Sequence, residues 1–347
     1  MKIILYLISL ICLCGYSPIA NAADPLFADD STIKIRIEAP FKQLIRKSKK
    51  SLNPYEAQLT LESPRAETHN ITLAARGKSR RTLGICKFPP LRVKFTDKPA
   101  PASLFEGQKS LKLVSHCKSQ SKYQQYNLLE YSIYKMYNVV TPQSLRVRLA
   151  HIDYVDSNSG KTYATQYGFF IEDMDDAAKR NGMKELDIPS IQRSQLDSQA
   201  AARGALFNYM VGNLDFSMTK GPPGSDCCHN GKLMGASKTS VGNIVYVPYD
   251  FDQTGFVDAE YSATPPKNFK IKTVRTRLYR GYCDHNAAVS LEAGNFLRNK
   301  DRIKAVVANN SLLKDKLKKS NLKYLDDFFQ TLSDPQKMDN KILKKCG

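Results

Sequence analysis

Two short stretches decide which fold and chemistry the sequence predicts: VGNLD at residues 211–215 and YVPYDFD at residues 246–252. The first closes a run of helical character with Gly-Asn-x-Asp, and the second closes a β-type run with Asp-x-Asp. The pair His229-Asn230 lies between them. This order predicts one carboxylate in the loop after a helix and two more at the end of a strand.

Carboxylates and an amide in this order suit phosphoryl transfer of the kinase type. Such a site needs a base for the acceptor hydroxyl, an amide, and a carboxylate that holds Mg²⁺. Asn230 is the candidate amide, whereas His229 stands beside two cysteines and is better explained as structural. Asp-x-Asp alone is as typical of turn residues that cap a strand, but the ordered combination is much less common by chance.

The N-terminus has the pattern of a secretory signal peptide over residues 1–22. A lysine is followed by an apolar run and then by the small-x-small sequence Ala20-Asn21-Ala22. The apolar run is short for a membrane span, which needs roughly 20 residues, and no later segment approaches that length. We therefore expect an exported protein, periplasmic or secreted, without a transmembrane segment.

Six cysteines remain after residue 22, and in an oxidising compartment they predict disulfides. Sequence does not fix the pairing. We expect Cys86 to bond Cys117, because both end adjacent strand-like runs, and the neighbours Cys227 and Cys228 to reach Cys283 and Cys346. Metal binding by these cysteines with His229 or His285 is the weaker alternative, since no Cys-x-x-Cys pair is present.

The formal net charge of +19 makes an anionic partner plausible, such as a nucleotide, an acidic protein, an anionic lipid or a nucleic acid. Many exported proteins are basic without any such ligand, so charge alone does not decide. The aromatic residues lie mostly in apolar runs and not among the lysines. Nucleic-acid binding is therefore disfavoured.

Periodicity predicts strands before residue 173 and mainly helices after it. Expected strands cover residues 32–38, 56–62, 70–75, 91–95, 110–114, 144–152 and 163–172, with helices at 41–50 and 123–137. Expected helices at 173–181, 194–211 and much of 291–344 surround a strand at 243–247. This order predicts an α+β fold of two lobes around a cleft, strand-rich over residues 23–172 and mainly helical over residues 173–347.

Several charged residues of the first part are candidates for holding a nucleotide. The basic segment at residues 76–81 contains Arg76, Lys78 and Arg80, and it suits either a phosphate or a solvated hairpin. Lys94 lies inside an apolar strand, where its side chain points either to solvent or into a cleft. Glu130, in the helix at residues 121–138, could pair with it to orient a phosphate, a recurring kinase device.

The order of these motifs resembles the spore-coat protein CotH kinase-like family, and in particular an exported bacterial branch of it. The similarity runs from about residue 76 to residue 255. It rests on RGKSR at 76–80, FPPLRVKF at 88–95, LFEGQK at 104–109, YGFFIE at 167–172, GNLD at 212–215 and PYDFD at 248–252.

The resemblance implies a bilobal atypical protein-kinase-like fold and an enzyme that transfers phosphate from Mg-ATP to a hydroxyl of an unknown protein, with an acidic protein as the candidate substrate. It implies that Asp215 is the catalytic aspartate. The implied Mg²⁺ ligands are Asn230, Asp250 and Asp252, and the implied nucleotide-binding residues are Arg76, Lys78, Arg80, Lys94, Glu130 and Glu172.

The chain departs from the family pattern after Asp215. Residues 216–228 intervene before His229-Asn230, where the family usually has a basic residue or histidine and then an asparagine close by. Either this loop returns Asn230 to the site, tethered by a disulfide, or the second metal site is missing. Glu172 could equally belong to the acidic start of the following helix. A non-catalytic envelope or surface binding protein, and transfer of a nucleotidyl group, are the alternatives to kinase chemistry.

Overall fold

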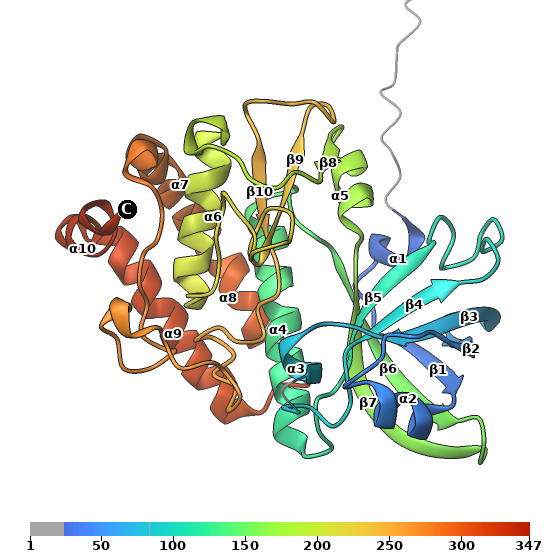
Figure 1. The fold of residues 1–347 in the computed structure, drawn as a ribbon. Coiled ribbons are helices and arrows are strands. Elements are labelled where there is room, and N and C mark those ends of the chain that lie inside the picture. Colours follow the sequence, from blue (N-terminus) through green and yellow to red (C-terminus); the bar gives the residue numbers. More distant parts are fainter. Residues whose placement is uncertain (1–23, 83) are drawn as a thin grey trace, which may run out of the picture.

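The structure is a computed structural model that describes residues 24–82 and 84–347 (Figure 1). The predicted signal peptide lies outside the described residues. The first part contains strands β1 (Ile33–Ala39), β2 (Tyr55–Ser63), β3 (Glu67–Ala75), β4 (Leu91–Phe95), β5 (Ser110–Val114), β6 (Val147–Asp156) and β7 (Lys161–Ile171). Its helices are α1 (Pro25–Ala28), α2 (Phe41–Lys47), α3 (Ser79–Thr82) and α4 (Ser121–Val140).

The second part is helical but also carries a sheet. Its α-helices are α5 (Met174–Arg180), α6 (Ser198–Val211), α7 (Asn286–Arg298), α8 (Lys300–Ala308), α9 (Asp315–Ser333) and α10 (Pro335–Lys341). Its strands are β8 (Lys184–Leu186), β9 (Gly231–Gly235) and β10 (Val245–Pro248), and its 3₁₀ turns are η1 (Arg193–Gln195), η2 (Lys267–Phe269), η3 (Cys283–His285) and η4 (Leu343–Lys345).

The seven strands of the first part close into a barrel in the order β1-β2-β3-β4-β5-β7-β6. Closure depends on a parallel pair, β1 with β6, in which Ile33 lies opposite Ala150; the other neighbours are antiparallel. Alternate residues of β1, such as Ile35 and Ile37, are fully buried, as expected for a strand with one face toward a core. The barrel interior is therefore a packed apolar core.

The predicted bilobal kinase-like fold is wrong. The strands form a closed mixed barrel, and the C-terminal half has its own three-stranded sheet in the order β10-β9-β8. A second apolar core joins both halves of the chain, because Leu129 and Phe169 pack in the same cluster as Phe207 and Phe251. Alternation in sequence indicates where strands lie but not which edges meet, so barrel closure and the shared core could not be read from it.

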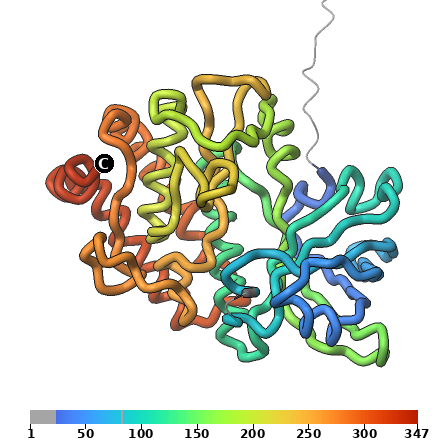
Figure 2. The backbone as a smooth tube through the Cα atoms, in the orientation of Figure 1, coloured from blue at the N-terminus to red at the C-terminus, as the bar shows by residue number. Residues whose placement is uncertain are grey.

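Helix α4 connects the barrel to the rest of the molecule. It packs against β6 and β7 of the barrel on one side and against α8 on the other. Figure 2 shows it running between the barrel strands and the C-terminal helices. Apolar residues all round its length, including Leu128, Ile133 and Met136, are buried. None of the helices in residues 24–82 and 84–347 is long and apolar enough to cross a membrane.

Three disulfides are present, and only one has the expected pairing. Cys86 bonds Cys117, as predicted. Cys283 bonds Cys346 and ties the C-terminus to η3, while the neighbours Cys227 and Cys228 bond each other, so the expected links between these two pairs are wrong. The expectation assumed that adjacent cysteines reach separate partners, and sequence alone does not exclude a bond between them.

Candidate active site

The loop after α6 positions Asp215. Gly212 ends α6 in the left-handed conformation at φ 67°, and a side chain there would collide with the Tyr324 hydroxyl. The Asn213 side chain then accepts a hydrogen bond from the Asp215 amide at 3.0 Å and donates one to the Asn208 amide oxygen at 3.0 Å. Gly-Asn-x-Asp is therefore a helix end followed by a locally bonded turn that presents the aspartate.

The loop at residues 216–228 folds back on Asp215. The Asp215 carboxylate lies 2.7 Å from Nε2 of His229, and the Asn230 amide donates to its backbone oxygen at 2.6 Å and to its carboxylate at 3.3 Å. The Ser217 amide bonds the His229 carbonyl at 3.0 Å and closes the loop. The Asp215 side chain remains 66% exposed. Of the two alternatives, the loop returns Asn230 to the aspartate.

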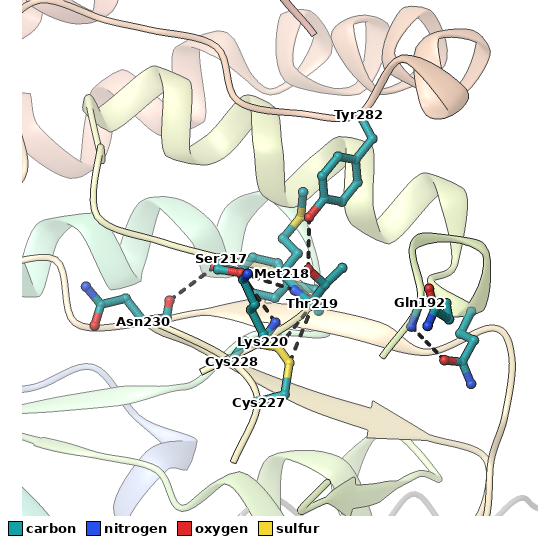
Figure 3. Close-up of a disulfide and its surroundings, with 11 residues drawn as sticks. Gln192, Ser217, Met218, Thr219, Lys220, Cys227, Cys228, Asn230 and Tyr282 are labelled. Atoms are coloured by element: carbon teal, nitrogen blue, oxygen red, sulfur yellow. Dashed lines mark hydrogen bonds between the residues drawn. A yellow bond between two sulfur atoms is a disulfide. The ribbon is translucent and has the colours of Figure 1, made fainter. Parts of the chain in front are cut away.

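A disulfide joins the neighbours Cys227 and Cys228 within this loop, immediately before His229 (Figure 3). Both cysteines are buried, and their sulfurs lie against the Met218 carbonyl. The backbone amide of Cys227 donates to Ile188 at 2.8 Å, and that of Cys228 donates to Gly231 at 3.2 Å. These backbone hydrogen bonds fasten the returning segment to its neighbours.

Asp250 is brought to the same place by the sheet. Strand β10 pairs with β9 up to Pro248 opposite Gly231, and the Tyr249 amide then donates to the Asn230 carbonyl at 3.2 Å. Asp250 follows in the left-handed region at φ 62°, a conformation unusual outside glycine, and its amide donates to the Tyr134 hydroxyl at 3.0 Å. Its side chain is exposed. One amide residue, Asn230, thus links Asp215 to the segment that carries Asp250.

Asp252, two residues further, does not share that exposure. It is buried and pairs with Nε of Arg80 from α3 at 3.3 Å. Glu130 of α4 is also buried in the neighbourhood of this arginine. We call Arg80, Glu130 and Asp252 the buried ion cluster. It joins the barrel side of the molecule to the segment after β10.

Burial governs the ionisation of this cluster. Burial raises the pKa of Glu130 to about 8, against the opposing pull of Arg80, and the neighbouring Asp252 and Asp250 raise it further. Burial also raises the pKa of Asp252 to about 6, again against Arg80. Although burial opposes it, the nearby carboxylates hold the pKa of Arg80 above its ordinary value. One guanidinium thus faces two carboxyl groups, and Glu130 keeps its proton near neutral pH.

Two cations approach from the barrel. Arg76, at the end of β3, feels the charge of Asp250, while burial lowers its pKa. Lys112 on β5 lies with its Nζ 5.4 Å from the centre of the Tyr249 ring, and burial lowers its pKa to about 8, with Arg76 adding to the effect. The sequence reasoning missed Lys112. The strand register pairs it with Arg92 on the outer face of the barrel, and this pairing cannot be read from the sequence.

The remaining predicted site residues are Lys78, Lys94 and Glu172. Lys78 and Lys94 are exposed, and among the described residues no ion pair joins Lys94 to Glu130. Glu172 is buried and forms an ion pair with Arg180 at 2.9 Å while it accepts a hydrogen bond from the Arg146 amide at 2.8 Å. These contacts explain Glu172 structurally.

The carboxylates do not gather in one cluster. In residues 24–82 and 84–347, no group of three or more His, Cys, Asp and Glu side chains is placed to hold a metal ion. Mg²⁺ at a nucleotide site requires less, since one or two carboxylates and the phosphates themselves suffice. The exposed Asp250 carboxylate and the Asn230 amide oxygen are the oxygen donors that fit such a role.

The arrangement combines exposed Asp215, which is held by two side chains, with the exposed carboxylate of Asp250. Arg76 and Lys112 are the cations on the barrel side of the segment that carries Asp250. Comparisons with protein-family models and with curated proteins find no match. The similarity to the CotH kinase-like family therefore stays a prediction.

Proposed function

We propose that the chain is an exported phosphotransferase that moves a phosphoryl group from Mg-ATP to a hydroxyl of a protein. One observation carries the proposal: Asn230 bonds Asp215 through its side chain and the residue before Asp250 through its backbone. Residues far apart in the chain that phosphoryl transfer would use are thereby joined. The disulfides and the absence of a membrane-spanning helix in the described residues support the export part of the proposal.

Asp215 would accept the proton of the attacking hydroxyl. Its carboxylate is exposed to a substrate, while His229 and Asn230 fix its orientation. Fixing a reacting group in advance lowers the barrier because less freedom is lost when substrates meet. His229 is in this scheme a positioning residue, which the sequence reasoning had set aside as structural.

Asp250 and the amide oxygen of Asn230 would hold Mg²⁺, whose charge would neutralise phosphate oxygens as transfer proceeds. The Asn230 amide nitrogen is already used by Asp215, which leaves its oxygen facing the other way. The left-handed conformations of Asn230 and Asp250 are a local cost of the kind that functional sites retain.

Arg76 and Lys112 would bind the phosphates. Both are partly buried, and burial penalises their positive charge. An incoming phosphate would remove that penalty by supplying the missing negative charge. Burial is the main cause of the lowered pKa of Lys112, and in the described part of the chain no carboxylate forms an ion pair with it, although Asp173 acts in the opposite direction.

Labelling tests the proposal. Purified residues 23–347 are incubated with Mg²⁺ and γ-labelled ATP, alone and with an acidic carrier protein, in wild type and in Asp250→Ala. Transfer of label by the wild type and its loss in the variant support the proposal. In a parallel incubation with α-labelled ATP, transfer of label to the protein would instead show nucleotidyl transfer.

Thermal melting with Mg-ATP separates an inactive binder from an enzyme. A metal-dependent rise in Tm that Asp250→Ala abolishes supports a nucleotide site. If Mg-ATP stabilises neither protein and no label moves, the phosphotransferase is refuted, and a non-catalytic binding protein is the remaining reading.

A further inference from the structure

A cavity of about 740 Å³ lies in the C-terminal part of the chain, outside the site described above. It is bounded by α9, α10 and the extended segment at residues 275–279, which Figure 1 shows beside α9. Its volume falls in the range of small-molecule pockets. Nothing in the proposed phosphotransfer uses it.

The cavity is lined by cations from three directions. Six of its described lining residues are basic, against one carboxylate, that of Asp327; the six are Arg275, Arg277, Lys323, Lys337, Lys341 and Lys345. Lys337 lies 3.6 Å from Asp334 and Arg275 lies 3.7 Å from Asp258, but the described residues hold no ion-pair partner for Lys323, Lys341 or Lys345. Like charges brought together in this way repel one another unless an anion lies between them.

Arg277 is fixed in place by direct contacts with neutral groups, while Asp327 acts on its charge only from a distance. Its Nε donates to the Met210 carbonyl at 3.0 Å, its Nη2 donates to the Tyr324 carbonyl, and its guanidinium lies 3.5 Å from the centre of the Tyr324 ring. No carboxylate of the described chain forms an ion pair with it, and burial lowers its pKa. A partly desolvated cation held by neutral groups is pre-organised to bind an anion.

The aromatic lining disfavours recognition of a nucleotide base. Both Arg275 and Arg277 lie over the Tyr324 ring, at 4.6 and 3.5 Å from its centre. The Tyr209 hydroxyl and ring are largely buried, as is Tyr279. Among the described lining residues no exposed aromatic face is thus left for stacking, and cations outnumber the single carboxylate.

We propose that this cavity binds a compact small molecule that carries several phosphate groups. A guanidinium matches the geometry of phosphate oxygens with two parallel donors, and lysine ammonium groups add charge without directional demands. The site is independent of the proposed phosphotransfer, so either can fail without the other.

Calorimetric titration with inorganic tripolyphosphate, without Mg²⁺, tests the proposal on residues 23–347. The variant Lys323→Ala/Lys341→Ala removes one cation from α9 and one from α10 at exposed positions. We expect its affinity to fall roughly tenfold or more, since two charge-assisted contacts are lost. The matched control, Lys98→Ala/Lys161→Ala, removes two exposed lysines of the barrel side and is expected to bind like the wild type.

Two further titrations test which site binds tripolyphosphate and whether phosphate groups are preferred over carboxylates. Asp250→Ala should retain tripolyphosphate affinity, because the proposed nucleotide site is elsewhere. Benzenetricarboxylate should bind at least several-fold more weakly than tripolyphosphate. Equal loss in the control pair, equal affinity for the tricarboxylate, or no binding by the wild type would overturn the proposal.

Discussion

Asp215 and Asp252 are both aspartates of predicted site motifs, yet the structure treats them in opposite ways. Asp215 is exposed and held by hydrogen bonds from His229 and Asn230. Asp252 is buried and neutralised by Arg80. An aspartate of the first kind is available to a substrate, whereas one of the second kind holds two parts of the molecule together. Burial and partner, more than the motif, separate a reactive carboxylate from a structural one.

The largest effect that this contrast predicts is on phosphoryl transfer. Asp215→Asn removes the base but keeps the size of the side chain, and the rate should fall by about 10²–10⁴-fold, the usual contribution of a positioned base. The free energy of unfolding should change by about 0.5 kcal/mol or less, because the side chain is exposed. Transfer rates and urea unfolding on the same samples check both. An unaffected rate would show that Asp215 is not the base.

Arg80→Met, in contrast to Asp215→Asn, should mainly lower the free energy of unfolding. It leaves Glu130 and Asp252 without their shared cation in a buried place, and removing one partner of a buried pair costs about 3–5 kcal/mol. Urea unfolding measures the loss. Arg46→Met, a change at an exposed arginine of α2, is the control. If both variants unfold alike, the cluster does not stabilise the fold.

The pH dependence of stability follows from the raised pKa of Glu130. Its folded pKa of about 8 lies above the ordinary pKa of 4.5 for a glutamate side chain, so over this range the folded protein holds a proton that the unfolded chain has released. The stability that this group contributes is present below about pH 4.5 and is lost as the pH rises through about 8. Glu130→Gln, which is neutral throughout, should flatten this part of the profile in urea unfolding between pH 5 and 8. A variant as steep as the wild type would assign the slope to other groups.

Most strands could be predicted, because a half-buried strand shows its alternation locally. Strands β4 and β5 were placed at the correct residues, and β1 within one residue at either end. Strand β9 was missed because glycines stand at both of its ends and weaken the β pattern. The parallel pairing of β1 with β6 could not be predicted, since it joins residues more than a hundred positions apart and leaves no local signal.

The site was predictable to the extent that its residues stand in an ordered motif. The structure brings Asp215, Asn230 and Asp250 together, and their order in the sequence had suggested it. Lys94 and Lys112 look alike in sequence, each a lysine at an outward position of an apolar strand. Lys112 lies near the site because of the barrel register and because Tyr249 packs beside it. Neither feature leaves a signal in the sequence around the two lysines.

The smallest predicted effect concerns the loop that carries His229 and Asn230. Cys227→Ala/Cys228→Ala removes a bond that restricts the backbone of this loop just before the two side chains that hold Asp215. Looser positioning should lower the rate several-fold while binding of Mg-ATP is little changed. Cys283→Ala/Cys346→Ala is the matched comparison, because that bond joins η3 to the C-terminus and closes a span of 63 residues. Its loss should lower the unfolding free energy instead, by constraining the unfolded chain less. If the first pair changes stability alone and the second changes the rate, the loop does not position Asp215 for chemistry.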